Sequence, residues 1–144
     1  MIVRRLSQLS RAFRGTMVSR KDVSEVEVGD YIEIVRSFDR DDVRSFGELI
    51  GDENPIHDGD VVQGHLCSSL FSSMLGTKFH GCIYMSQDVK YRRILRINEL
   101  VEARVTVRRV MSRGDKILLK CDTTCKLFAE KDVVVADGHA MVSV

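Results

Sequence analysis

The sequence predicts an α+β domain in which an antiparallel sheet packs against one buried helix. One observation behind this prediction is that strand-like patterns fill most of the chain after residue 82. The other is that two helical patterns lie between a first strand and that region. The chain has 144 residues, 44% of them hydrophobic and only one of them proline, which fits a single globular domain and excludes a disordered chain.

One strand and one helix are predicted near the start of this domain. Residues 28–38 carry β-branched and aromatic side chains and begin with a Gly-Asp turn, which predicts a strand. Asp39 provides an N-cap acceptor and Asp42 an acid in the first turn, so a helix is expected to begin here. Gly51 is the expected end of this helix.

A second helix, from about Gly64 to Leu75, is predicted to be the buried centre of the domain. It follows a polar loop over residues 51–63. Between its apolar positions stand serines and a cysteine, which are small enough to let other backbone approach closely. Gly76 is expected to end this helix.

Four strands are predicted in the second half of the chain. Apolar and polar residues alternate along the second of them. The sequence Ser-Arg-Gly-Asp at 112–115 is a hairpin signal, so the last three strands are expected to form a meander. The four predicted strands are residues 83–91, 100–111, 117–128 and 133–144.

The charge of the chain is unevenly distributed. There are 22 Lys and Arg against 21 Asp and Glu, yet residues 1–21 contain only basic charges. Apolar residues of this segment share one helical face, opposite Arg4 and Arg11, with serines between. This pattern is typical of a mitochondrial targeting segment; the alternatives are a basic surface helix, a frayed tail or a helix lying on an anionic membrane. The domain itself would then span residues 22–144.

Composition and cysteine usage argue against several other classes of protein. The chain after residue 21 is mildly acidic, which argues against nucleic-acid binding through net positive charge. No apolar run approaches the length of about 18 residues that suggests a membrane span. Without a Cys-x-x-Cys motif the thiols are expected to be reduced, and Cys121 and Cys125 are expected to be buried on one strand face. The four histidines lack zinc-like spacing, so no metal site is predicted.

The most informative stretch is the loop at 51–57, with the sequence GDENPIH. Pro55 restricts its own backbone and that of Asn54, so Asp52 and His57 are held at a fixed separation. A carboxylate and an imidazole on a stiff loop can act as an acid/base pair, because histidine titrates near neutrality and the acid can orient or share a water. The alternative is ordinary turn chemistry with a surface histidine.

Residues 46–57, FGELIGDENPIH, resemble the signature of the MaoC-like (R)-specific enoyl-thioester hydratases, which have the hotdog fold. The resemblance continues through VVQGHL at 61–66, through SLFS and MLGT within 69–77, and through IYMSQDVKY at 83–91. It covers residues 28–144, and the chain is especially similar to the mitochondrial 3-hydroxyacyl-thioester dehydratases of type 2. The resemblance implies an antiparallel sheet wrapped around a central helix, and a homodimer whose two sheets join edge to edge.

The resemblance also implies a reaction and a set of residues that perform it. The reaction is the reversible dehydration of (R)-3-hydroxyacyl thioesters to trans-2-enoyl thioesters, which makes the family hydro-lyases. Asp52 and His57 match the catalytic pair, which handles a single water. Gly64 matches the glycine whose backbone N–H faces the thioester carbonyl, and as the expected start of a helix it suits a developing enolate oxygen. Ser72 matches a serine that supports the pair from the central helix, and Asn54 matches a positioning residue of the loop.

The same resemblance predicts the partners of the protein. It implies no metal and no redox cofactor, and a substrate carried on coenzyme A or on the phosphopantetheine of acyl carrier protein, in the mitochondrial matrix. A basic cluster could dock the phosphates of these carriers, or an acidic carrier protein itself. The alternative is a solvated strand edge with protective charges. The cluster consists of Lys90, Arg92, Arg93 and Arg96.

The chain departs from the family pattern between His57 and Gly64. Only residues 58–63 separate them, whereas the family has about ten residues more, a difference that loops can absorb. Gln63 also stands where the family usually has histidine. Two alternatives to a dehydratase therefore stay open: a non-catalytic hotdog subunit that binds a partner such as acyl carrier protein, and an acyl-thioesterase on the same fold.

Overall fold

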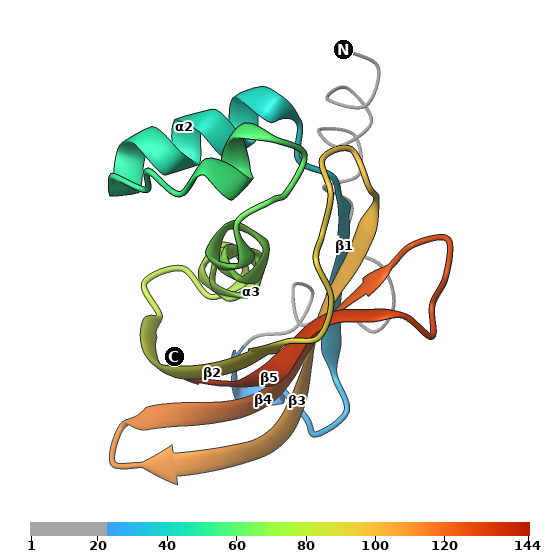
Figure 1. Ribbon diagram of the computed structural model, residues 1–144. Coiled ribbons are helices and arrows are strands. Elements are labelled where there is room, and N and C mark those ends of the chain that lie inside the picture. The colour runs from blue at the N-terminus through green and yellow to red at the C-terminus, as the bar shows by residue number, and fades with distance from the viewer. Residues whose placement is uncertain (1–22) are drawn as a thin grey trace.

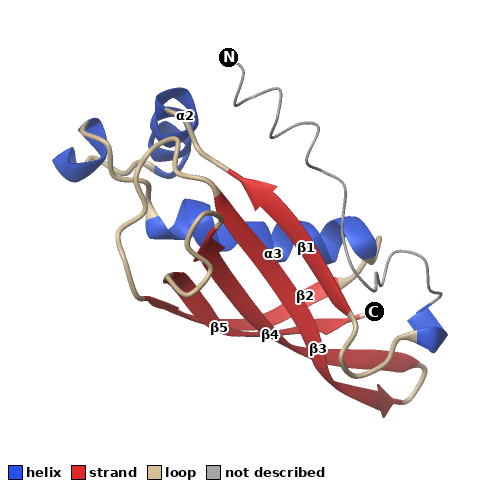
Figure 2. Ribbon diagram, turned by 90° about the vertical axis from the view of Figure 1, so that its right-hand side faces the viewer, coloured by secondary structure: helices blue, strands red, loops and turns tan. Residues whose placement is uncertain are grey.

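The computed structural model describes residues 23–144, and the predicted targeting segment at 1–21 lies outside them. The described chain forms one five-stranded antiparallel sheet, in the order β1-β3-β4-β5-β2, that curves around helix α3 (Figure 1). Figure 2 shows the strands crossing over α3. The strands are β1 (Tyr31–Arg36), β2 (Ile83–Tyr91), β3 (Val101–Arg113), β4 (Lys116–Leu127) and β5 (Val134–Ser143); the helices are η2 (Val23–Glu25), α2 (Arg40–Ile50), η3 (Pro55–Asp58) and α3 (Gly64–Lys78).

Helix α2 begins and ends where the sequence predicts. Asp39 is its N-cap and accepts a hydrogen bond from the backbone of Asp42, whose side chain accepts one from Asp39 in return. Gly51 ends the helix in a left-handed conformation with φ of 70°, which glycine adopts without steric cost. The expected end of α3 at Gly76 is wrong, because the helix continues to Lys78 before Phe79 is buried against the core.

The core lies between α3 and the concave face of the sheet. Phe71 on α3 is fully buried, and the predicted central position of this helix is confirmed. Along β3 the buried and half-buried residues alternate, so one side of the strand faces the helix. Cys121 and Cys125 are also buried, as predicted. The inward-facing residues of β3 are Val101, Ala103, Val105 and Val107.

Strand β2 forms one edge of the sheet. Within the described chain it is hydrogen-bonded only to β5, and its other side is open. Several of its apolar side chains are exposed, among them Ile83, Met85 and Tyr91. In residues 23–144 no helix is long and apolar enough to cross a membrane.

Candidate active site

The loop between α2 and α3 is held in shape by its own polar side chains. Asp52 Oδ1 accepts a hydrogen bond from the backbone N–H of Asn54 at 3.0 Å. Asn54 Oδ1 accepts one from the backbone N–H of Ile56 at 3.2 Å and so caps the short 3₁₀ helix η3. Pro55 opens η3, where its missing N–H is not needed. These hydrogen bonds, together with Pro55, restrict the backbone of the loop and account for its expected stiffness.

The structure brings Asp52 and His57 together. His57 Nε2 lies 3.6 Å from Asp52 Oδ2, and both side chains are largely buried. The other ring nitrogen, Nδ1, lies 2.9 Å from the backbone oxygen of Val61. Because a carbonyl oxygen can only accept, Nδ1 carries a proton, and in the neutral tautomer of the ring Nε2 presents its lone pair toward Asp52. At 3.6 Å the two groups are too far apart for a good direct hydrogen bond, but close enough to hold one small polar molecule in common.

Two cavities of about 550 Å³ share His57 and Asn54 in their linings, and Asp52 lines the first of them. We call the first the α2 cavity; its lining includes Arg40, Gly47, Asp52, Asn54, His57 and Gln63. We call the second the β2 cavity; its lining includes Ile56, His57, Gly64, Tyr91, Arg92 and Arg93. Because His57 faces both, its imidazole can act on a molecule that enters either cavity.

Gly64 lies in the β2 cavity as the first residue of α3. Its neighbour Gln63 is the N-cap residue but makes no side-chain cap hydrogen bond, in contrast to the full capping box of α2. The first turn of a helix carries unpaired N–H groups and a partial positive charge, which suit a developing oxyanion. A Cβ at Gly64 would lie 2.8 Å from the ring of Tyr91, so this position has no room for another side chain.

Ser72 lies apart from the pair. It is two turns further along α3, its side chain is exposed, and it lines neither the α2 cavity nor the β2 cavity. Within one chain no contact joins it to Asp52 or His57, and its supporting role stays a prediction. A different serine of α3, Ser68, is buried and contacts the cavity residue Tyr91.

The short segment at 58–63 is held from two sides by arginine side chains. Arg40 donates from Nη1 to the backbone oxygens of Asp58 and Gly59, at 2.9 and 2.8 Å. On the other side, Arg96 Nη1 donates to both carboxylate oxygens of Asp60, each at 2.8 Å. Sequence reasoning missed these contacts, because the partners lie 18 and 36 residues apart and nothing local links them.

Gln63 has a mixed environment. Its side chain is 4% exposed and donates from Nε2 to the backbone oxygen of Val43 in α2 at 2.8 Å. Its Oε1 atom is buried and has no hydrogen-bond partner among the described residues. Such a buried acceptor without a partner is rare in folded proteins, because it loses its hydrogen bonds to water without replacing them. Gln63, which departs from the family pattern, is therefore expected to lower the stability of the fold.

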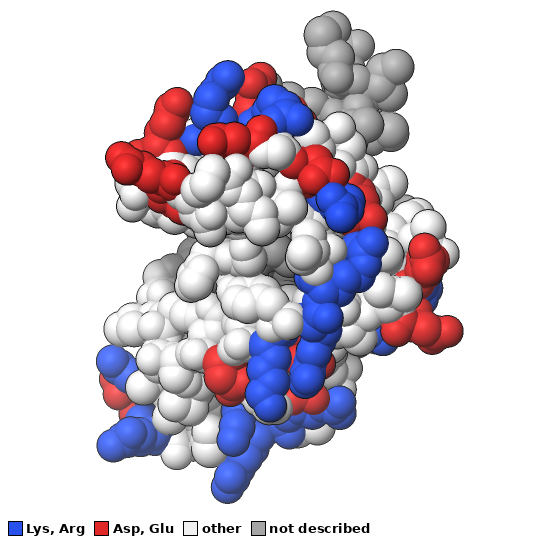
Figure 3. All heavy atoms as spheres, in the orientation of Figure 1, with Lys and Arg blue, Asp and Glu red and all other residues white. Residues whose placement is uncertain are grey.

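The three arginines of the predicted basic cluster are all paired within the chain. Arg92 bonds Asp137 at 3.1 Å, Arg96 bonds Asp60, and Arg93 holds Glu99 in a bidentate pair at 2.9 and 3.0 Å. The hydrogen bond from Arg93 lowers the pKa of Glu99. Figure 3 shows Lys and Arg side chains in a band across this face, with Asp and Glu among them. The positive charge is therefore partly neutralised, although Arg92 and Arg93 still line the β2 cavity.

Comparison with known proteins identifies relatives of the chain. It is 32% identical over 133 residues to a 3-hydroxybutyryl-CoA dehydratase of Methylorubrum extorquens, covering 83% of this chain and 82% of the relative. It is 27% identical over 126 residues to a mitochondrial 3-hydroxyacyl-[acyl-carrier-protein] dehydratase of Arabidopsis thaliana, covering 80% of this chain and 75% of the relative. No protein-family model matches the sequence.

The fold points to the same proteins. The solved structure of an (R)-hydratase from Aeromonas caviae that takes part in PHA biosynthesis aligns with a TM-score of 0.74 and 26% identity, over 83% of this chain and 98% of that one. The predicted hotdog arrangement, a sheet wrapped around one helix, is thereby confirmed. The chain belongs to the MaoC-like hotdog family of (R)-specific enoyl-CoA hydratases and 3-hydroxyacyl-thioester dehydratases.

Proposed function

We propose that this protein catalyses the reversible dehydration of (R)-3-hydroxyacyl thioesters to trans-2-enoyl thioesters. The observation that carries the proposal is the geometry of Asp52 and His57, whose Oδ2 and Nε2 atoms face each other at 3.6 Å beside two cavities. Both atoms are acceptors in the tautomer fixed by Val61, so a water between them can donate one proton to each. Its lone pairs then point away from the pair, as a nucleophile requires.

The chemistry balances with these groups alone. In hydration the water oxygen bonds to the β-carbon, one proton of that water passes to the Asp52–His57 pair, and the pair delivers a proton to the α-carbon, so that its own proton count is restored. The electrons displaced onto the thioester oxygen are stabilised by the backbone N–H of Gly64 at the start of α3. Dehydration is the reverse. The reaction transfers no net electrons, so we propose that the enzyme works without a redox cofactor. We also propose that it works without a metal, since the Asp52–His57 pair and the Gly64 N–H supply the proton transfer and the oxyanion stabilisation.

The substrate is proposed to arrive on coenzyme A or on the phosphopantetheine of acyl carrier protein. The relative from Methylorubrum extorquens is named for a coenzyme A substrate, and the relative from Arabidopsis thaliana for an acyl-carrier-protein substrate. Arg92 at the β2 cavity supports phosphate recognition, because it bonds Asp137 through Nε and guanidinium groups bind phosphate oxygens bidentately. Arg93 adds positive charge to this cavity while holding Glu99. The mitochondrial relative, together with the basic segment at 1–21, supports a location in the mitochondrial matrix.

A homodimer is proposed through the open edge of β2. Pairing this edge with a second copy would satisfy its backbone groups and cover the exposed side chains of Ile83 and Met85. Sedimentation velocity tests this directly: a Met85→Lys variant should shift the protein toward the monomer, whereas Leu49→Lys, a change at an exposed residue of α2, should not.

The catalytic proposal is tested with the full chain and two substrates, crotonyl-CoA and (R)-3-hydroxybutyryl-CoA. Enoyl absorbance reports hydration or dehydration, and free thiol reports thioester cleavage. His57→Ala and Asp52→Asn should each lower kcat by about 10²–10⁴-fold with little change in folding. Asp115→Asn and His80→Ala are matched controls, since both residues are exposed and line neither cavity.

Each alternative function has its own outcome in this assay. Release of free thiol without a change in enoyl absorbance would indicate a thioesterase. No turnover of either substrate by a folded wild-type protein would indicate a non-catalytic subunit. An active, normally folded His57→Ala protein would exclude the proposed mechanism.

A further inference from the structure

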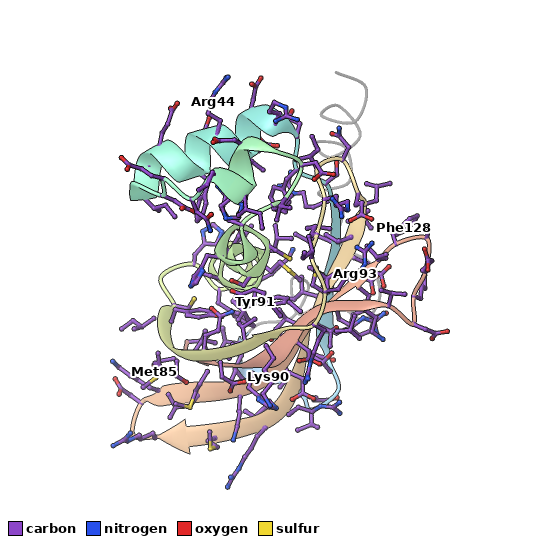
Figure 4. All side chains as sticks on the ribbon, viewed as in Figure 1. Arg44, Met85, Lys90, Tyr91, Arg93 and Phe128 are labelled. Atoms are coloured by element: carbon purple, nitrogen blue, oxygen red, sulfur yellow. The ribbon has the colours of Figure 1, made fainter. Side chains whose placement is uncertain are left out.

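Tyr91, the last residue of β2, lies against the first turn of α3. A Cβ built on Gly64 would lie 2.8 Å from Tyr91 Cε1 and 3.0 Å from Cδ1, so the ring covers the place where a side chain would begin. Figure 4 shows Tyr91 between β2 and α3. The residue lines the β2 cavity together with His57 and Gly64. The aromatic ring is therefore in direct contact with the residue proposed to bind the thioester oxygen.

The ring is fixed by one hydrogen bond. Its hydroxyl lies 3.0 Å from Ser68 Oγ, one turn beyond Gly64 on the same helix. Ser68 itself donates to the backbone oxygen of His65 at 3.3 Å. A serine hydroxyl has a single proton, so with that proton in the bond to His65, Tyr91 is the donor to Ser68 Oγ. This assignment ties the phenol to α3 in one orientation.

The surroundings suggest more than core packing. Ser68 is buried, but Tyr91 is 45% exposed, which is unusual for an aromatic ring placed only to fill the core. One side of the ring is occupied by Gly64, and the residue also lines the cavity. A substrate bound at Gly64 in this cavity would therefore lie beside the ring.

We propose that Tyr91 is a positioning residue: its ring, held by Ser68, is the cavity wall that keeps the thioester carbonyl at the backbone N–H of Gly64. This inference rests on the proposed dehydratase function. Oxyanion stabilisation requires the donor and the oxygen to meet within a few tenths of an ångström, and a misplacement of about 1 Å can lower the rate about 100-fold. A rigid wall next to the donor supplies that precision, which loop residues alone would not.

The first test removes the hydrogen bond and keeps the ring. Tyr91→Phe and Ser68→Ala abolish the same contact, so each should lower kcat for crotonyl-CoA about threefold to tenfold with a smaller change in KM. The double variant should be no worse than either single variant, because only one bond is lost. Ser69→Ala is the matched control: Ser69 also donates to a backbone oxygen three residues before it, but it is exposed and lacks a bond to Tyr91.

The second test uses the close contact with Gly64. Gly64→Ala should displace the ring and lower kcat strongly, because its new methyl group would lie 2.8 Å from Tyr91. Tyr91→Leu should lower kcat by about 100-fold by removing the wall. In the Gly64→Ala/Tyr91→Leu protein the clash is gone, so its kcat should equal that of Tyr91→Leu alone. If the two substitutions acted independently, the fold reduction in kcat of the double variant would be the product of the two single reductions.

The outcomes separate this inference from the proposed function. Unchanged kcat in Tyr91→Phe and Ser68→Ala, or multiplying effects in the Gly64→Ala/Tyr91→Leu protein, would overturn the role of Tyr91. A lower melting temperature with unchanged kcat would also overturn it, since that is what simple packing predicts. In both cases Asp52→Asn would still be inactive and the dehydratase proposal would stand. Wild-type activity in Asp52→Asn would instead remove the proposed mechanism.

Discussion

Replacing the buried Gln63 with leucine should make the protein more stable. The glutamine offers one good hydrogen bond, from Nε2 to Val43 O, and one buried oxygen without a partner among the described residues. Leucine removes both and fills nearly the same space. Gly47 lies close by, because a Cβ built on it would lie 3.4 Å from Gln63 Nε2, and the leucine side chain does not extend beyond the position of that atom.

The magnitude follows from these two terms. Losing the bond to Val43 costs about 0.5–1.5 kcal/mol, and Val43 O remains within the hydrogen-bonding pattern of α2. Removing the orphaned oxygen recovers about 1–3 kcal/mol of desolvation penalty. The net expectation for Gln63→Leu is a gain of about 1 kcal/mol in the free energy of unfolding. For a domain of this size that corresponds to a rise of roughly 3–5 °C in melting temperature.

Urea unfolding followed by far-UV circular dichroism, at one protein concentration for all variants, measures this difference. Gln63→Glu is the contrasting variant, since its carboxylate would face the Val43 carbonyl without a partner, and it should lose about 3 kcal/mol or more. A loss of 1 kcal/mol or more in Gln63→Leu would refute the reasoning. That result would mean that Oε1 is satisfied in the folded protein and that the polar side chain supports the fold.

Three further predictions follow from other contacts. Arg40→Ala removes both hydrogen bonds to the 58–63 segment and should lower kcat about tenfold, because His57 is then held less firmly. Arg44→Ala, which removes an exposed ion pair on the same helix, should leave kcat unchanged. Steady-state kinetics compares the two variants. Arg93 lowers the pKa of Glu99, so the Arg93→Ala variant should have a lower free energy of unfolding than wild type above the unfolded pKa of about 4.5. This difference in free energy should vanish as the pH falls through the lower pKa of Glu99 in the folded protein. Urea titrations from pH 3 to 7 measure it. Phe71→Ala leaves a cavity at a fully buried position and should cost about 3–5 kcal/mol in urea unfolding.

Local signals in the sequence predicted most of the fold and the centre of the site. Asp39, Asp42 and Gly51 carry the chemistry of a capped helix, and the structure uses each of them in that way. The pairing of Asp52 with His57 could be predicted because the proline between them stiffens a loop of only a few residues. In each case the interacting groups lie close together in the sequence, where residue type and spacing determine the geometry.

The predictions that were incomplete involve residues far apart in the chain. The end of α3 depends on where Phe79 meets the core, and this contact outweighs the glycine at position 76. Asp137, the partner of Arg92, is 45 residues away in the chain. The local sequence therefore predicted a basic cluster but not the acidic residue that neutralises part of its charge. The contact of Tyr91 with Ser68 likewise requires β2 and α3 to be in place. Such contacts form only when distant segments pack together, so the local spacing of residues does not predict them.

The hydrogen bond from His57 to Val61 gives the length of the 58–63 segment a chemical meaning. The carbonyl of Val61 selects which ring nitrogen carries the proton, and therefore which nitrogen faces Asp52. A segment of another length would place a different carbonyl, or none, beside Nδ1. The backbone of a short connection thus selects the tautomer of the neighbouring imidazole, and a deletion or insertion there would change which ring nitrogen faces Asp52.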